Sequence, residues 1–468
     1  MFKEVLTFSF FLLLVSCSIF ANDGTIAKIE SIVIIGNKKT KDRIIYRELD
    51  FVIGDSVSVV AFNDRMVLST KRLYNTGLFN VVEIRFTDFN ATKNSLTVII
   101  DLIENLYIYP VPIFELADRN LNVWWNEQNR SFKRVNYGVR LDHLNTTGGH
   151  DRLKLKFQRG YTRKYEVKYS YPYVFGDVGL GGSIFYAEQK EIPYITLNNK
   201  PQFFQSADER IMLRRFRTTF EIVYRPSLYT WQNLRIEFHR NSVDEMVAQD
   251  LNPNYFQTGK ASMKFFLVEY NLDYNKRIFN IYPEGGYRIN FNIKKEGLGI
   301  FSEFNNLPIF IDADYNFKIV NGLISSTRVK VKANLIRDEL AFANNTGLGY
   351  GNTVVGGYEY YVLDGSDYIF NENQLKFRFL NRMIDFGKMM PVKGFKKLNI
   401  QLFLRANFDL AYVNERTYTD TNDLNNKWII GYGPAIDVLL FHNFLFKFEY
   451  SINQLGESGL FISNSLGF

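Results

Sequence analysis

Residues suited to catalysis or metal binding are few and widely spaced in this sequence. The four histidines, His143, His150, His239 and His442, lack the spacing of metal ligands, and Cys17 is the only cysteine. No Gly-x-Ser-x-Gly sequence marks a nucleophilic serine. We therefore predict no catalytic residue, metal or cofactor, and we expect that the chain is not an enzyme.

A glycine pair is the first feature of the sequence that constrains the backbone. Gly356 and Gly357 lie between Val355 and Tyr358, within the aromatic stretch TVVGGYEYYVLDG of residues 353–365. Beside β-forming residues, such a pair usually marks a tight turn or bulge that needs positive φ. The surrounding elements decide which surface it approaches.

A strand-like run near residue 400 is the second such feature. Asp409 would be a buried carboxylate, which is costly without a cation, so it should find another partner or face a lumen wet enough to solvate it. Arg405 is the nearest candidate partner, through a long reach or a water. The period-two pattern predicts two faces. Leu402, Leu404, Ala406, Phe408 and Leu410 should face lipid, whereas Gln401, Arg405, Asn407 and Asp409 should face the interior.

The same alternation extends over most of the chain. In residues 444–453, FLFKFEYSIN, aromatic residues alternate with charged and polar ones, and residues 152–158 and 233–240 repeat the pattern. Aromatic residues make up 16% of the sequence, with 43 Phe and 29 Tyr. A soluble sandwich also alternates, but its core would favour Val, Leu and Ile, so aromatic outer faces indicate a membrane β-barrel.

The length of this region predicts the size of the barrel. Residues 107–468 at about 22 residues per strand and connection give about sixteen antiparallel strands. A lumen of that width is too large for wall side chains to fill. We therefore expect a plug, with its tip at the glycine pair and its loop around residues 345–368.

The N-terminal part has two other patterns. Residues 1–21 combine Lys3 with a short apolar run, as in a secretory signal, with either cleavage after Ala21 or lipidation at Cys17. Residues 26–106 then alternate strand and helix signals in the order β-α-α-β-β, with the second helix opened by Asn63 or Asp64 and ended by Gly77. This order predicts a small soluble α+β domain.

That domain resembles the POTRA domain of the Omp85 superfamily. The resemblance rests on Gly36-Asn37, Thr40, Arg47-Glu48-Leu49, Gly54-Asp55, the run from Leu73 to Phe79, and the closing LTVIIDLIE. It implies a periplasmic domain that offers a sheet edge to unfolded clients or to accessory proteins, followed by a barrel in the outer membrane.

The barrel carries further resemblances to that superfamily. Residues Val355 to Tyr358 resemble the Val-Arg-Gly-Tyr tetrad of its plug loop, and Phe408-Asp409 resembles its Phe-x-Asp-x-Gly motif on a late strand. The tetrad's arginine, which the family pairs with the acidic residue matched by Asp409, is Gly356 here. A terminal Phe468 after alternating residues resembles the assembly signal of outer-membrane barrels.

Two functions are compatible with this organisation. In the first, the chain assembles outer-membrane proteins, capturing client strands with its POTRA-like domain and inserting them through a lateral seam. In the second, it is a pore that secretes one dedicated protein. A plugged barrel acting only as a porin or anchor explains the N-terminal domain less well. Expected partners are unfolded outer-membrane or secreted clients, accessory periplasmic or lipoprotein subunits, and outer-membrane lipids, but not nucleic acid.

The seam is predicted between the first and last barrel strands. The first contains Pro110 and Pro112, which lack a backbone donor, and the last contains Leu460, Leu466 and Phe468. Pairing across this seam should therefore be shorter than between ordinary neighbours. The formal charge of +7 is compatible with contact to anionic lipid head groups.

Overall fold

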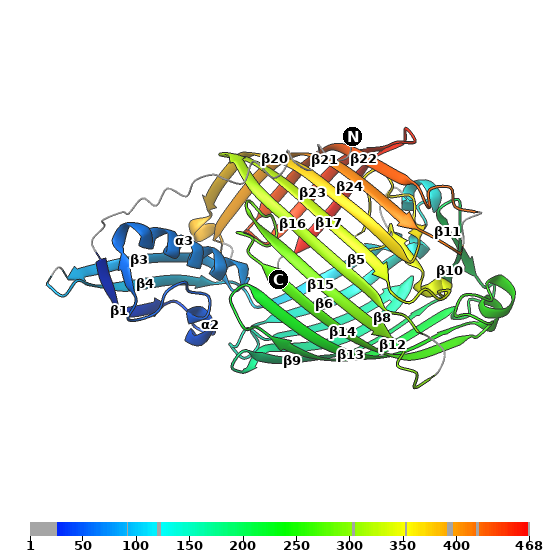
Figure 1. Cartoon of the computed structure of the whole chain (residues 1–468), viewed down its shortest axis with the longest axis horizontal. Helices are drawn as coiled ribbons and strands as arrows, with labels where there is room; N and C mark the ends of the chain where they lie inside the picture. Colours follow the sequence, from blue (N-terminus) through cyan, green and yellow to red (C-terminus); the bar gives the residue numbers. More distant parts are fainter. Residues whose placement is uncertain are drawn as a thin grey trace, which may run out of the picture.

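The computed structural model describes residues 26–90, 92–118, 123–301, 305–351, 353–390, 396–417 and 421–466. The expected signal segment, with Cys17 and Ala21, lies outside these residues, as does Phe468. A small α+β domain lies at one end of a large sheet that curls into a barrel (Figure 1). Within the described residues the sheet has sixteen strands, which confirms the predicted number.

The N-terminal domain has one strand more than the sequence predicts. Its sheet has the order β2-β1-β4-β3, in which β1 and β4 are parallel. The additional strand β2 spans three residues, too short for its alternation to be recognised in the sequence. The elements are β1 (Ile26–Ile35), α2 (Asp42–Tyr46), β2 (Ser56–Ser58), α3 (Val59–Asn75), β3 (Phe79–Asn90) and β4 (Ser95–Glu104).

The long helix α3 covers one face of this sheet. Phe62, Met66 and Leu73 repeat at helical spacing and are buried against the sheet. The helix begins at Val59, earlier than the predicted Asn63 or Asp64, because burial of Phe62 extends it toward the N-terminus. It ends as predicted before Gly77, whose φ of 71° is left-handed.

The barrel strands are all antiparallel to their neighbours. They are β5 (Ile108–Leu116), β6 (Val135–Leu144), β7 (Arg152–Gly160), β8 (Thr162–Phe175), β9 (Val178–Gln189), β12 (Leu213–Tyr224), β13 (Thr230–Val243), β14 (Ser262–Asn275), β15 (Gly286–Glu296), β16 (Pro308–Val320), β17 (Leu323–Asn334), β20 (Asp367–Asp385), β21 (Lys397–Asn414), β22 (Trp428–Leu440), β23 (Phe444–Asn453) and β24 (Ser458–Leu466).

Short elements occupy the loops far from the N-terminal domain and one turn near it. The hairpin of β10 and β11 lies at the far end of the barrel (Figure 1). Within the described residues, no helix combines the length and apolar character needed to span a membrane. The short elements are η1 (Val123–Glu127), η2 (Phe132–Arg134), β10 (Glu191–Leu197), β11 (Lys200–Gln205), η3 (Val247–Leu251), η4 (Phe342–Asn344), β18 (Thr346–Leu348), β19 (Leu363–Asp364) and η5 (Gly387–Met389).

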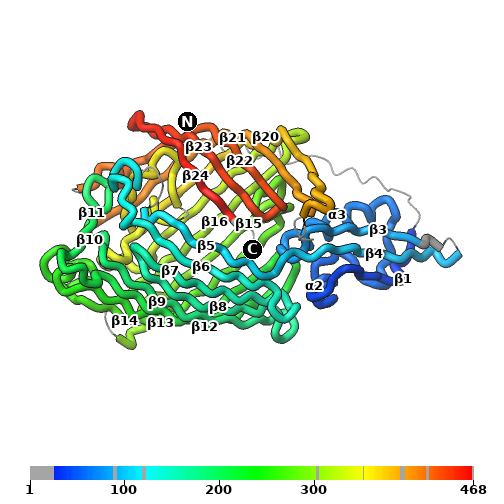
Figure 2. The backbone as a smooth tube through the Cα atoms, turned by 180° about the vertical axis from the view of Figure 1, so that it is seen from behind, coloured from blue at the N-terminus to red at the C-terminus, as the bar shows by residue number. Residues whose placement is uncertain are grey.

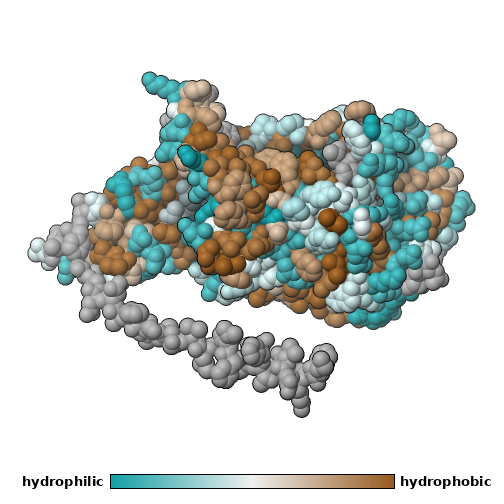
Figure 3. Space-filling view, turned by 90° about the horizontal axis from the view of Figure 1, so that it is seen from above, coloured by the Kyte–Doolittle hydropathy of each residue, from teal (hydrophilic) through white to brown (hydrophobic). Residues whose placement is uncertain are grey.

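The two faces of the wall differ as the alternation requires. Phe446, Phe448 and Tyr450 of β23 are exposed on the outside, whereas Ser451 and Asn453 are buried inside. Hydrophobic surface gathers on the barrel near the N-terminal domain, and the far end is mostly hydrophilic (Figure 3). This distribution is typical of a lipid-facing band above which polar loops extend into water.

Candidate functional site: the plug, its wall and the seam

The loop between β17 and β20, residues 335–366, folds into the barrel. Its strands β18 and β19 pair with each other, which gives the loop a narrow stem. Val355 and Tyr358, on either side of the glycine pair, are buried against Phe370, Val413 and Ile429 of the inner wall. The position and stem of this loop fit the plug expected from the sequence.

The glycine pair contacts three neighbouring wall strands directly. The backbone N–H of Gly356 donates to Asp409 Oδ2 of β21 at 3.0 Å. The side-chain amide of Asn453, in β23, donates to the carbonyl oxygen of Gly357 at 2.7 Å. A Cβ on Gly431 of β22 would lie 1.7 Å from the carbonyl oxygen of Gly356. At Gly431 the backbone of the plug tip therefore lies directly against the backbone of the wall.

Each position of the pair favours glycine for a different steric reason. Gly357 has a φ of 78°, which favours glycine, and its backbone passes close to Asn453. A Cβ on Gly356 would point into an acidic corner, 3.3 Å from Asp409 Oδ2 and 3.4 Å from Glu449 Oε1. In the related tetrad an arginine would occupy this direction, whereas here a backbone N–H contacts the carboxylate.

Arg405 does not take Asp409 as its partner. Its Nε donates to Asp437 Oδ2 at 2.7 Å, and its Nη2 lies 3.0 Å from Glu449 Oε2. The predicted link from Arg405 to Asp409 is therefore wrong. Residues four apart along a strand are about 13 Å apart, whereas neighbouring strands lie only about 4.8 Å apart, so the lateral partners are closer. Phe408, in the same motif, lies on the outer face and is 47% exposed.

A carboxylate within the plug is shielded from water. Burial raises the pKa of Glu359 to about 8, and the nearby carboxylates of Glu449 and Asp409 raise it in the same direction. Glu359 follows the tip directly, so its charge state depends on how closely the plug lies against the wall.

A second loop enters the barrel from the end near the N-terminal domain. Residues 276–285, between β14 and β15, carry Tyr282 inward, where its ring lies 4.4 Å from that of Phe403. The O–H of Tyr282 donates to Asp437 Oδ2 at 2.7 Å, and Glu284 pairs with Arg378. Sequence reasoning missed this loop, although the apolar residues in RIFNIYP are unusual for an exposed turn.

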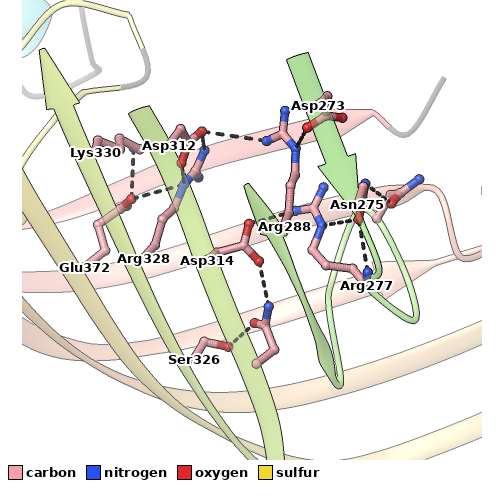
Figure 4. Close-up of polar contacts among 12 residues, drawn as sticks. Asp273, Asn275, Arg277, Arg288, Asp312, Asp314, Ser326, Arg328, Lys330 and Glu372 are labelled. Atoms are coloured by element: carbon pink, nitrogen blue, oxygen red, sulfur yellow. Dashed lines mark hydrogen bonds and ion pairs between the residues drawn. The ribbon is translucent and has the colours of Figure 1, made fainter. Parts of the chain in front are cut away.

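Ion pairs on the inner wall anchor the base of this loop. Arg277 lies 3.5 Å from Asp314, and Arg288 pairs with Asp273 at 2.5 Å. The series continues across β16, β17 and β20 through Arg288–Asp312, Arg328–Asp312 and Lys330–Glu372 (Figure 4). These side chains come from adjacent strands and point into the lumen.

The same loop is held by the N-terminal domain. The side-chain amide of Asn75, at the end of α3, donates to the carbonyl oxygen of Ile278 at 3.2 Å. The backbone N–H of Asn280 donates to Asn75 Oδ1 at 3.2 Å. Nearby, the ring of Tyr74 lies 5.0 Å from that of His442 in the turn between β22 and β23. One helix end thus contacts turns from separate parts of the barrel.

Several residues that carried the family resemblance form the rest of this junction. Glu48 is buried and pairs with Arg225, whose Nη2 lies 3.0 Å from Glu48 Oε2. Thr40 accepts a hydrogen bond from the side-chain amide of Asn145 at 2.9 Å. Arg47 pairs with Asp177 in the turn between β8 and β9. These polar residues join the domain to the turns of the barrel.

The pairing order of the barrel sheet begins at β5 and ends at β24. No β-ladder joins these two strands within the ranges that the structure describes. Figure 2 shows the two strands at the facing margins of the sheet. In the part of the chain that the structure describes, β5 and β24 each form a ladder on one side only.

The two prolines lie on the open side of β5. Ala117 N–H, just beyond β5, donates to the carbonyl oxygen of Arg134, beside β6. The direction of the backbone N–H and C=O groups alternates along a strand. Odd-numbered residues of β5 therefore direct these groups toward β6, and even-numbered residues direct them away. Pro110 and Pro112 are even-numbered. The amide hydrogens that they lack are therefore missing from the open edge.

The same alternation indicates which residues of β24 direct their backbone groups toward β23. Asn453 N–H donates to the carbonyl oxygen of Glu457 at 3.0 Å, which continues the register between β23 and β24. Even-numbered residues of β24, including Leu460 and Leu466, therefore direct their backbone groups away from β23. Of the residues predicted to form the seam, Pro110, Pro112, Leu460 and Leu466 lie on the two end strands, and Phe468 lies outside the described residues.

Comparison with known proteins identifies the domain and the fold. Residues 27–105 match the POTRA family, described as a surface antigen variable number repeat. No curated protein sequence matches the chain. CdiB from Escherichia coli is 10% identical with a TM-score of 0.53, covering 97% of this chain and 93% of that one. CdiB from Acinetobacter baumannii is 12% identical with a TM-score of 0.50, and the match covers 94% of this chain and 74% of that one. BamA from Haemophilus ducreyi, lacking POTRA domains 1–3, is 15% identical with a TM-score of 0.49, and the match covers 94% of this chain and 84% of that one.

Proposed function

From a POTRA domain joined to a sixteen-stranded barrel of the Omp85 fold, we propose that this chain assembles β-barrel proteins into the outer membrane. Its POTRA domain lies in the periplasm and captures extended client strands. The clients pair with an open edge of the barrel and pass sideways into lipid. Outer-membrane lipids and accessory periplasmic or lipoprotein subunits are its further partners.

The separated edges of β5 and β24 carry this proposal. A backbone group without a partner in lipid costs several kcal/mol, so end strands that form no ladder with each other in the described residues favour a further strand that pairs with them. The prolines shorten the run of donors on the β5 edge, which lowers the stability of direct closure between β5 and β24. An incoming client strand can pair in a different register, in which it uses the remaining donors and acceptors.

The POTRA domain offers a second edge of the same kind. Its strand β3 pairs with β4 on one side only, within the described residues. The N–H of Val82 points away from β4 and donates to the hydroxyl of Tyr74 at 3.1 Å. By alternation, Ile84 and Phe86 direct their backbone groups to the same side. This edge is suited to strand addition by an extended client.

The second candidate function is secretion of a dedicated protein through the lumen. It is favoured by a cavity of about 790 Å³ between the plug loop and the wall formed by β8, β9, β12 and β13. In that case the plug would leave the wall, and the seam would have no role in transport. The two candidates therefore require opposite behaviour of the plug and the seam.

A disulfide across the seam separates them. We expect that Phe114→Cys with Leu460→Cys, both exposed on the outer face, joins β5 to β24 on oxidation. Oxidation should stop insertion of client barrels, and reduction should restore it, whereas each single cysteine variant should remain active. Normal insertion by the fully oxidised protein would refute lateral assembly. Loss of one secreted protein on depletion, with outer-membrane barrels unaffected, would favour the secretion pore.

A further inference from the structure

The cavity beside the plug is lined by three positively charged side chains. Lys164 of β8 and Arg215 and Arg217 of β12 line it together with the ring of Phe185. The guanidinium carbon of Arg217 lies 5.1 Å from the ring centre of Phe185, and Lys164 Nζ lies 5.9 Å from it. Two cations thus lie near the ring of Phe185.

These cations have no carboxylate partner among the residues that the structure describes. No ion pair within 4.0 Å involves Lys164, Arg215 or Arg217 in those ranges. The Nε atoms of Arg215 and Arg217 are buried and meet no acceptor there. A buried donor without an acceptor is costly, and a charged one is more so.

The carboxylates that line the same cavity already have partners. Asp118 pairs with Arg134 at 2.8 Å, and Glu127 pairs with Lys200 at 2.5 Å. Glu296 accepts a hydrogen bond from the side-chain amide of Asn306 at 2.8 Å. None of these lining carboxylates pairs with the three cations, and the carboxylates of Glu237, Glu115 and Glu166 act on Arg217 and Lys164 only from beyond 4.0 Å.

We propose that Lys164, Arg215 and Arg217 form a binding site for a small multivalent oxyanion inside the barrel. An arginine side chain presents parallel N–H donors that match carboxylate or phosphate oxygens, and a lysine adds a third charge. A volume of about 790 Å³ lies in the range of small-molecule sites. This inference does not depend on whether the protein inserts or secretes its clients.

Binding to the purified full-length chain tests the site. Citrate and inorganic phosphate serve as probes, with calorimetric titration as the measurement and acetate as the monovalent comparison. We expect saturable binding of citrate, weaker binding of phosphate, and none of acetate in the same range. In Arg215→Gln the citrate Kd should rise about tenfold or more, because a charged donor pair is lost. The matched control is Arg214→Gln, which removes the same charge from the exposed neighbouring residue.

Two results overturn the proposal. One is absence of saturable citrate binding to the wild-type chain. The other is an equal loss in Arg214→Gln and Arg215→Gln, which would indicate diffuse attraction to a basic surface. If Arg215→Gln does not assemble into a heat-modifiable barrel, Lys164→Met provides the same comparison from β8, and an unchanged citrate Kd there also rejects the site.

Discussion

The hydroxyl of Tyr282 and the carboxylate of Asp437 meet at 2.7 Å inside the barrel, although Tyr282 belongs to a turn loop and Asp437 to a wall strand. Arg405 donates to the same carboxylate oxygen and also pairs with Glu449, which lies beside the plug tip. Asn75 of the POTRA domain holds the other end of the loop. Polar contacts thus join the POTRA domain to this loop, and the loop through Asp437 and Arg405 to Glu449 beside the plug tip.

The first prediction concerns these polar contacts. Tyr282→Phe keeps the ring on Phe403 but removes the O–H, so we expect a loss of about 1 kcal/mol in barrel stability. If these contacts transmit POTRA movement, Tyr282→Phe and Asn75→Ala should show non-additive effects on the unfolding midpoint. Tyr315→Phe, on the exposed outer face, is the control. Strictly additive changes would mean that the contacts are structural and carry no coupling.

The second prediction concerns the contact between the plug tip and β22. In Gly431→Ala the added Cβ would meet the carbonyl oxygen of Gly356 at 1.7 Å, so the tip has to move away. We expect higher conductance in planar bilayers and a cost of about 1–3 kcal/mol. Gly182→Ala, on β9, is the control, since the nearest atom to its Cβ is 3.2 Å away. Equal conductance in the two variants would place the tip elsewhere.

The third prediction tests the missing arginine of the tetrad. In Gly356→Arg the side chain starts toward Asp409 and Glu449, so we expect an ion pair to replace the backbone hydrogen bond. The net stability gain should be near zero, because desolvation offsets attraction, but openings of the plug should become rarer. Asp409→Asn, made in both backgrounds, measures the coupling. Additive effects on channel noise would show that position 356 does not interact with Asp409.

The sequence predicts which face of a strand each residue of this site occupies, but not which residues it contacts on neighbouring strands. Alternation along a strand was enough to place Asp409 inside and Phe408 outside, because the pleat fixes the face of each residue. The partners of Arg405 lie on β22 and β23, and they depend on the register between strands, which spacing along the chain does not contain. Tyr282 was missed for a similar reason, since its loop enters the lumen only in the assembled barrel.

The fourth prediction is a pH dependence of plug docking. The pKa of Glu359 is raised from 4.5 to about 8, so the docked plug binds a proton that the released loop gives up more readily. Docking should therefore be strongest below about pH 4.5 and weaken as the pH rises through about 8. Conductance noise recorded from pH 5 to pH 9 should increase accordingly. In Glu359→Gln this increase should disappear, whereas Glu209→Gln, in an exposed turn, should retain it.

The last prediction concerns the prolines at the seam. Pro110→Ala with Pro112→Ala adds two N–H donors to the open edge of β5 without changing its ladder with β6, because even-numbered residues point away from that strand. The longer run of donors should favour direct pairing of β5 with β24. We expect a more heat-resistant barrel and slower client insertion into liposomes, measured by protease protection of the client. Pro193→Ala, in the β10–β11 hairpin outside the barrel sheet, should change neither. A double variant that inserts clients at the normal rate would show that donors on this edge do not limit opening, and the seam would then have to be controlled by the β24 side.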